Sequence, residues 1–201
     1  HLEHIVVKAY GTDFKNLETD LNVDYKAPRG QLQNNTSRCI HMAKSFMEAI
    51  PNLQVTEDLQ EALKTVEVEK VVLSRDRTAL RIYILSKRLI PKKNIYILEA
   101  NIKKQMFPHK EIVIKIVEKY QLSSQYTPEK LLEAYRDSIL LELKHYSMLD
   151  YQMFRKAEVT FPEPELLEMT ITEGLVQHRC GDELKRVLEK VFNERCGFGI
   201  E

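Results

Sequence analysis

The stretch LRIYILSKRLIPKKNIYILEANIKKQMFPHKEIVIKI, residues 80–116, decides the fold of this 201-residue chain. It begins with alternating apolar residues, passes through a basic turn, and continues with apolar residues spaced three and four apart. Alternation is typical of a half-buried strand, and the wider spacing is typical of an amphipathic helix. A second alternating run, Ile112–Ile116, closes the stretch. It therefore predicts strand, helix and strand in that order.

The run before this stretch predicts a second strand. Residues from Val68 to Val72 are rich in valine, and SRDR, residues 74–77, has the polar character of a turn. A β-hairpin across 74–78 is the natural pairing. The element order is therefore β-β-α-β, and we place this first unit at residues 67–119.

The second half of the chain repeats this order more weakly. Alternating apolar residues predict two short strands, apolar spacing predicts a helix over 182–192, and a last strand starts at Phe198. A shift of 86 residues places Leu98 on Leu184, along with several other core positions. We interpret residues 156–201 as a second, truncated ββαβ unit. Chance agreement between two common motifs is the alternative.

The remaining segments of the chain are predicted to be helices and a polar leader. Thr127-Pro128-Glu129 combines an N-cap, a proline at the first helical position and an early acid, so a helical connection is predicted over 127–155. Residues 42–66 are predicted to form a small helical N-terminal region. Residues 1–41 are predicted to be an unassigned, flexible leader or linker. The fold class is thus α+β: a small helical N-terminal cap, then two β-β-α-β units joined by a helical segment.

The composition is that of a globular cytoplasmic protein. Lys and Arg total 30 and so do Asp and Glu, so no net charge steers the chain towards nucleic acid. No apolar run reaches about 18 residues, so no membrane span is predicted. Cys39, Cys180 and Cys196 leave an odd thiol, which favours a reducing compartment. His178 and two of these cysteines could begin a zinc site, but a fourth ligand is missing.

Motifs for catalysis are absent from the sequence. Neither GxxxxGK[ST] nor GxGxxG occurs, and GxSxG and HExxH are also missing. Acidic pairs such as Glu57-Asp58 lie at helix starts, where compensation of the helix dipole explains them. We therefore predict no catalytic, cofactor-binding or metal-binding residue in this segment, and no small-molecule ligand.

Local charge gives one candidate contact surface. Residues 70–104 hold ten Lys or Arg and two acids, whereas residues 157–201 hold five basic and ten acidic residues. Clustered Lys and Arg are what phosphate-backbone binding needs, although a solvated face or a dock for an acidic partner is an equally simple reading. The candidate partner or nucleic-acid contacts are Arg75, Arg77, Arg81, Lys87, Arg88, Lys92 and Lys93.

From residue 42 onward the chain resembles the N-terminal region of the PolC-type DNA polymerase III alpha subunit, the replicative polymerase of low-GC Gram-positive bacteria. Three segments carry the resemblance: LRIYILSKRLIPKKNIYILEANIKKQMFP, YTPEKLLEAYRDSILLELKHYSMLDYQMFRKAEVTF and DELKRVLEKVFNERCGFGIE. Together with their surroundings they cover 42–201. Residues 1–41 match nothing in the family.

The resemblance implies a function that the residues do not show. The full-length enzyme is a DNA-directed DNA polymerase with a 3'-5' exonuclease, for which Mg²⁺ is expected and which contacts DNA. For the N-terminal region, the resemblance implies a non-catalytic assembly module of KH-like shape, with the clamp-loader tau subunit as a suspected partner. This segment is expected to be inactive alone. The alternative is a stand-alone KH-like nucleic-acid-binding module that uses the basic patch over 70–104.

Overall fold

A computed structural model of the protein describes residues 38–171 and 181–201, and the chain divides into two compact units. Unit 1 contains residues up to 85 together with 96–117, and unit 2 contains 86–95 and 118–201. Both units combine helices with a β-sheet, so the α+β fold class is confirmed. The two units are described separately below.

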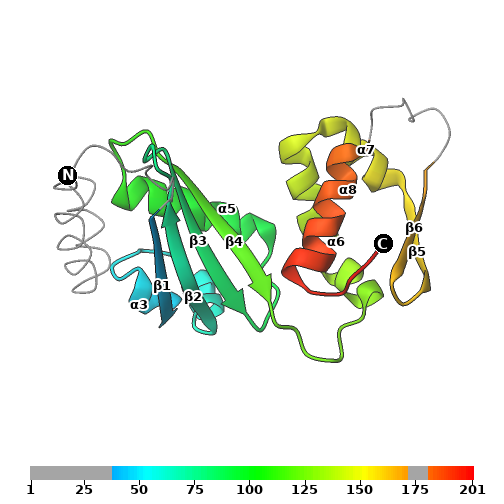
Figure 1. Ribbon diagram of the computed structural model, residues 1–201, viewed down its shortest axis with the longest axis horizontal. Helices are drawn as coiled ribbons and strands as arrows, with labels where there is room; N and C mark the ends of the chain where they lie inside the picture. Colours follow the sequence, from blue (N-terminus) through cyan, green and yellow to red (C-terminus); the bar gives the residue numbers. More distant parts are fainter. Residues whose placement is uncertain (1–37, 172–180) are drawn as a thin grey trace, which may run out of the picture. The chain divides into compact units, whose positions relative to one another are not determined.

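Unit 1 is built on a four-stranded sheet in the order β1-β2-β3-β4 (Figure 1). Strands β2 (Val66–Leu73) and β3 (Ala79–Ser86) form the predicted hairpin, whose turn is closed by the Ser74 N–H donating to the Ala79 carbonyl at 2.8 Å. Along β3 the even-numbered residues are buried and the odd-numbered ones are not. The sheet therefore has one core face and one face turned to solvent, as alternation in the sequence predicts.

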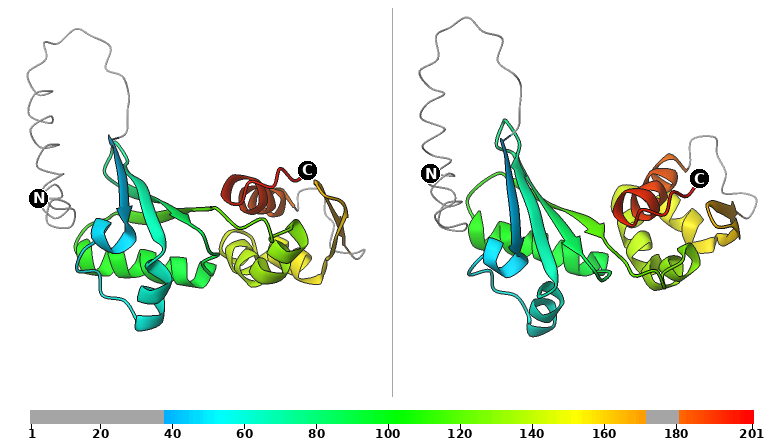
Figure 2. Two further views of the ribbon diagram at one scale, coloured as in Figure 1. Left: turned by 90° about the horizontal axis from the view of Figure 1, so that it is seen from below. Right: turned by 60° about the horizontal axis from the view of Figure 1, so that its bottom comes forward.

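Strand β4 (Val113–Tyr120) lies beside β3 and runs in the same direction. The Val113 N–H donates to the Thr78 carbonyl at 2.7 Å, and the Gln121 N–H donates to the Ser86 carbonyl at 2.9 Å. From the first bond to the second, the donor on β4 and the acceptor on β3 both move forward along the chain by the same number of residues. This is the pattern of parallel pairing. The connection between the strands is α5 (Lys92–Met106), and within unit 1 it covers the core face of the sheet (Figures 1 and 2). This is the predicted β-α-β crossover.

The N-terminal part differs from its prediction. Residues 38–41, which the sequence placed in a leader, form the first half of β1 (Arg38–Ser45), antiparallel to β2. Only two short helices follow: α3 (Phe46–Ala49), with a capping box between Ser45 and Glu48, and α4 (Glu57–Leu63). A register shift between His41 and Lys44 interrupts the alternation of β1, so its sequence does not look like a strand. Residues 1–37 of the predicted leader lie outside the described residues.

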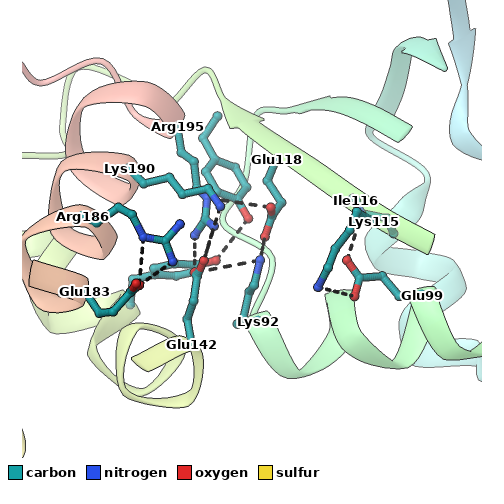
Figure 3. Close-up of polar contacts among 12 residues, drawn as sticks. Lys92, Glu99, Lys115, Ile116, Glu118, Glu142, Glu183, Arg186, Lys190 and Arg195 are labelled. Atoms are coloured by element: carbon teal, nitrogen blue, oxygen red, sulfur yellow. Dashed lines mark hydrogen bonds and ion pairs between the residues drawn. The ribbon is translucent and has the colours of Figure 1, made fainter. Parts of the chain in front are cut away.

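The exposed edge of the unit 1 sheet is protected. In parallel pairing the N–H groups of every second β4 residue face away from β3, and Ile116 is one of these. Its N–H donates to Glu99 Oε1 of α5 at 2.9 Å, and Lys115 Nζ lies 3.8 Å from the other oxygen of Glu99 (Figure 3). The Glu99 carboxylate thus satisfies a backbone donor that would otherwise be open to another strand.

Unit 2 is mainly helical. The long helix α6 (Pro128–Tyr146) starts at Thr127, whose side chain accepts the Lys130 N–H, and α7 (Met148–Lys156) follows after a single residue. This confirms the predicted helical connection. The hairpin of β5 (Glu158–Glu163) and β6 (Leu166–Thr170) is next, and α8 (Asp182–Glu189) continues into a π-helical turn, η2 (Lys190–Arg195).

The predicted last strand of unit 2 is represented by a single paired residue. The Glu201 N–H donates to the Glu165 carbonyl at 2.9 Å, and the Leu167 N–H donates to the Glu201 carbonyl at 3.2 Å. Residues 197–200 form no regular secondary structure, and Gly197 and Gly199 have positive φ. Among the described residues of this segment, Glu201 is the one that pairs with β6.

Candidate functional site

Three of the candidate basic residues lie in unit 1, at or near the β2–β3 turn. Arg75, Arg77 and Arg81 are exposed. The turn that carries the first two is tightly closed, because the Ser74 hydroxyl accepts the Thr78 N–H and donates to Asp76 at 2.6 Å. These hydrogen bonds, first that from Ser74 and then those from Thr78, lower the pKa of Asp76 to about 2. The turn therefore displays a fixed carboxylate between its two arginines, which reduces its net positive charge.

The other four candidates lie in unit 2: Lys87 and Arg88 precede α5, and Lys92 and Lys93 are its first two residues. Lys87, Arg88 and Lys93 are exposed, and the Ser86 hydroxyl donates to the Arg88 carbonyl at 2.7 Å. Lys92 is different, because it is 5% exposed. The predicted cluster thus separates into a unit 1 set and a unit 2 set, and Lys92 belongs to the interior.

Lys92 opens a buried network of charges in unit 2 (Figure 3). Its Nζ donates to Glu118 Oε1 at 2.6 Å and lies 3.9 Å from Glu142 Oε2. Arg195, from η2, makes a bidentate pair with Glu142 of α6, at 2.7 and 2.8 Å. Its Nε has no hydrogen-bond partner but lies 3.7 Å from Glu118 Oε2, an ion-pair distance. The two cations and the two carboxylates are therefore paired with one another. Lys190, which is more exposed, lies 3.7 Å from Glu142 Oε1.

The environment shifts the pKa values of Lys92, Glu142 and Arg195. Burial lowers the pKa of Lys92, and the nearby Glu118 only partly offsets this. Burial acts to raise the pKa of Glu142, but the hydrogen bonds and charge of Arg195 outweigh it, so the pKa is lowered. Burial likewise opposes the charge of Arg195, and the two carboxylates overcome it and raise its pKa. Glu142 and Arg195 therefore remain charged, as a pair.

Two tyrosines line the same interior. Tyr120 donates to the Ile90 carbonyl at 3.2 Å, and its hydroxyl lies 3.4 Å from that of Tyr135, with the rings edge to face. Burial, followed by neighbouring negative charge, raises the pKa of each. The Lys92 N–H also donates to Ser138 Oγ at 3.0 Å. The polar groups of this interior are used to join α5, β4, α6 and η2 within unit 2.

The carboxylates of this network are enclosed and paired. Both carboxylates of the network are about 1% exposed and are held by cations, so neither is available to a substrate. Within residues 38–171 and 181–201, no cluster of three or more His, Cys, Asp or Glu could hold a metal ion. His178 and Cys180, considered above for zinc, lie outside these ranges. In the described helices none is long and apolar enough to cross a membrane.

The sequence contained signals for part of the network. Glu118 has the same parity as the buried Ile114 and Ile116, so strand alternation places it inward. Glu142 lies three residues after Ile139 and next to Leu143 on the buried face of α6. A charged residue at a core-facing position needs a partner of opposite charge. The charge of these two residues at core-facing positions was the signal for the network. Arg195 carried the same signal, because it lies three residues after the buried Phe192 and four after the buried Val191.

One part of the chain matches a known family. Residues 45–116, from the end of β1 to the middle of β4, match the family model described as DNA polymerase III polC-type N-terminus I. These residues are similar to the N-terminal region of a PolC-type DNA polymerase III. The family connects the chain to a replicative DNA polymerase and so to DNA replication and the replisome. Comparison with curated proteins and with solved structures gave no match.

The match supports the central part of the resemblance seen in the sequence. It contains the first quoted segment, which spans β3 and α5, and leaves the other two, in unit 2, outside its limits. Arg75, Arg77 and Arg81 fall inside the matched residues, as do Lys87, Arg88 and Lys93. The family description names no contact residues, so their role is a matter for proposal.

Proposed function

We propose that this chain is a non-catalytic assembly module of a PolC-type replicative polymerase, and that it contacts the clamp-loader tau subunit. The observation that carries the proposal is the match of the N-terminus I family to residues 45–116. The polymerase, its 3'-5' exonuclease and its Mg²⁺ belong to the full-length enzyme, and this module is inactive alone. Its place of action is the cytoplasm, with the replisome.

Two features of the chain support a role in assembly. The buried carboxylates of Glu118 and Glu142 are each paired with cations, so these charged groups serve the interior of unit 2. The exposed arginines Arg75 and Arg81 stand on a rigid hairpin of unit 1, where side chains are positioned for a partner surface. A rigid element presents a contact at lower entropic cost than a loose loop.

The first experiment tests the absence of catalysis. The purified chain is incubated with a primed DNA template, deoxynucleoside triphosphates and Mg²⁺, and separately with a labelled single strand. We expect no primer extension and no shortening of the strand. Activity that co-purifies with the chain and survives a change of expression host would contradict the proposal.

The second experiment tests the partner and the surface together. The chain is passed over immobilised tau subunit, and the double variant Arg75→Glu, Arg81→Glu is compared with the control Lys64→Glu, Lys104→Glu, which makes the same charge change elsewhere on unit 1. Reversing charge at an electrostatic rim mainly slows association, so we expect on the order of tenfold weaker binding for the arginine variant alone. Equal binding by all three proteins would exclude this surface, and no binding by any would exclude tau.

Nucleic acid is the competing partner for the same arginines. Titration with single-stranded and duplex DNA over a range of salt separates the two, because each phosphate contact contributes a slope of about −0.9 for duplex DNA. The tau proposal predicts no DNA binding that depends on Arg75 and Arg81. A steep salt slope lost in the double variant would favour the nucleic-acid-binding module instead.

A further inference from the structure

Strands β3 and β4 of unit 1 carry apolar residues on both faces of the sheet. Their inward residues, such as Ile82 and Ile116, are buried in the core. Most of their outward residues within unit 1 are apolar as well: Ala79, Tyr83, Leu85, Val113 and Val117. Parallel strands occur mostly where both faces of a sheet are covered, and they then have nearly continuous apolar sequences. The outer face of this pair is thus more apolar than contact with solvent requires.

The described helices of unit 1 lie on the inner face of the sheet (Figure 2). Helix α5 crosses that face, and the segment after α3 is tied to it, because Gln54 and Gln105 exchange two hydrogen bonds of 2.8 Å. On the outer face, Val113 at the start of β4 is 56% exposed. Among residues 38–85 and 96–117, no helix covers the outward apolar residues.

Two cations on the outer face lack an acidic partner. Lys70 of β2 lies across from Tyr83, with its Nζ 4.5 Å from the ring centroid, and Arg81 is exposed two residues before that tyrosine. Neither makes an ion pair with a described residue, although Glu67 and Glu69 are exposed in the first half of β2. The surface therefore has positive charge beside its apolar residues that an acidic partner would neutralise.

The third cation of this face is already paired. The hydrogen bond from Val113 to Thr78 places Lys115 opposite Arg81 in the parallel register. Like charges directly opposite each other are unfavourable, and the Lys115 ammonium lies 3.8 Å from Glu99 at the edge of the sheet. Arg81 has no such carboxylate nearby, so it is the stronger candidate for a contact with a partner.

A protein segment suits this surface better than a nucleic-acid strand does. Platforms for single strands stack successive bases on several aromatic rings. In the unit 1 parts of β2, β3 and β4, Tyr83 is the one aromatic residue on the outer face, and Lys70 already lies over its ring. Aliphatic side chains make up the rest of the apolar area, and the apolar stripe of an amphipathic helix packs on such a surface.

We propose that the outer face of the unit 1 sheet binds an amphipathic helix of a partner protein. The apolar stripe of this helix lies over β3 and β4, and acidic side chains beside the stripe are directed at Lys70 and Arg81. The sheet is then covered by α5 on one face and by the partner on the other. The proposal rests on the assembly role proposed above and deepens it, because it specifies the kind of segment that the module binds.

The test uses the whole chain and three fluorescein-labelled peptides, each of about 18 residues so that a helix can form. The first has leucine at helical spacing flanked by glutamate, the second has lysine in place of glutamate, and the third has the residues of the first in scrambled order. Fluorescence anisotropy should show binding of the glutamate peptide that is on the order of tenfold tighter than that of either other peptide. Equal binding of the three would overturn the proposal.

Two pairs of variants test the face itself. Val113→Gln removes an exposed apolar side chain from the outer face, and Ile97→Gln removes one from α5, where Ile97 is 40% exposed. The first should weaken binding of the glutamate peptide about tenfold, the effect of one buried apolar side chain, and the second should not. Arg81→Glu should reverse the preference between the glutamate and lysine peptides, whereas Lys104→Glu, the same charge change on α5, should keep it. An unchanged preference in the Arg81 variant would refute the charge argument.

Nuclear magnetic resonance locates the peptide and tests other occupants. A spin label on the glutamate peptide should broaden the methyl signals of Val117 more than those of Ile97, and unchanged methyl signals of Ile82 in each variant show that the sheet is intact. Three results would assign the face to something else and overturn the proposal. They are Overhauser contacts of the Tyr83 ring with residues 1–37 in the free chain, self-association that Val113→Gln abolishes, and displacement of the peptide by a lower concentration of oligothymidylate.

The outcome for this face can be separated from the outcome for tau. If the Val113 variant binds the tau subunit as tightly as the natural chain does, the face is excluded and the assembly role stands. If the glutamate peptide binds as expected and tau does not, the identity of the partner is wrong and the face stands.

Discussion

Removal of one carboxylate from the buried network should destabilise unit 2 far more than removal of a carboxylate from the protein surface. In Glu142→Gln the side chain keeps its shape and loses its charge. Lys92 and Arg195 then share Glu118 alone, so one positive charge remains buried without compensation. Breaking a buried ion pair by removing one partner costs about 3–5 kcal/mol. For a domain of this size, that is a large fraction of the total stability.

Removal of both partners provides the decisive comparison. Glu142→Leu together with Arg195→Met leaves the neutral Lys92–Glu118 pair, which is connected by a 2.6 Å hydrogen bond. Replacement of a buried ion pair by apolar residues is often neutral or stabilising. We therefore expect the double variant to be more stable than Glu142→Gln, although it changes more atoms.

Native-state hydrogen exchange is the appropriate measurement, because unfolding of a chain with two units need not be two-state. The amides of Ile139 and Leu143 are in the middle of α6 and report on unit 2, and those of Ile82 and Ile84 report on unit 1. Only the first pair should lose protection in Glu142→Gln. Glu189→Gln, which breaks the exposed pair with Lys185, is the control and should change exchange by less than about 0.5 kcal/mol.

The same network predicts the response to acid. Since the pKa of Glu142 is lower in the folded state, its ionisation stabilises unit 2 fully above its usual 4.5 and progressively less as the pH falls below that value. Protection of α6 should thus decline below about pH 4.5 in the natural chain and decline less in Glu142→Gln. If the single and double variants are equally stable, or if their acid responses match that of the natural chain, the network does not carry the stability assigned to it.

Three further predictions follow from single contacts. Because the folded-state pKa of Tyr120 is raised, its contribution is present below pH 10 and lost as pH rises above it, so Tyr120→Phe should flatten the alkaline decrease in α6 protection. The Asp150 carboxylate accepts the N–H groups of Gly181 and Leu184 at 2.9 and 3.2 Å, so Asp150→Ala should cost about 1–2 kcal/mol in urea unfolding. Glu99→Ala exposes the Ile116 N–H at the β4 edge and should increase concentration-dependent association in light scattering.

Matched substitutions separate these effects from a simple change of side chain. Tyr151→Phe alters a half-buried ring of α7, Asp182→Ala removes an acid from the same helix start, and Glu111→Ala removes an exposed carboxylate near β4. Each control should change the measured quantity less than its partner. A control that equals its partner would show that the named contact is not responsible.

Local patterns in the sequence predicted the elements whose causes are local. The β2–β3 hairpin has alternating strands around a polar turn, and α6 has Thr127 and Pro128 at its start. Strand β1 could not be predicted this way, because its register shift interrupts the alternation and its partner, β2, lies more than 20 residues away in the chain. Pairing with a distant strand supplies order that the segment does not show in isolation.

The basic patch illustrates the same limit for function. Lys92 lies among Lys87, Arg88 and Lys93, and in the sequence it looks like one more surface cation. Its buried position depends on Glu118 and Glu142, which lie 26 and 50 residues further along the chain, so no window around Lys92 reveals it. A count of clustered charges overestimates a contact surface whenever one of them has a buried partner.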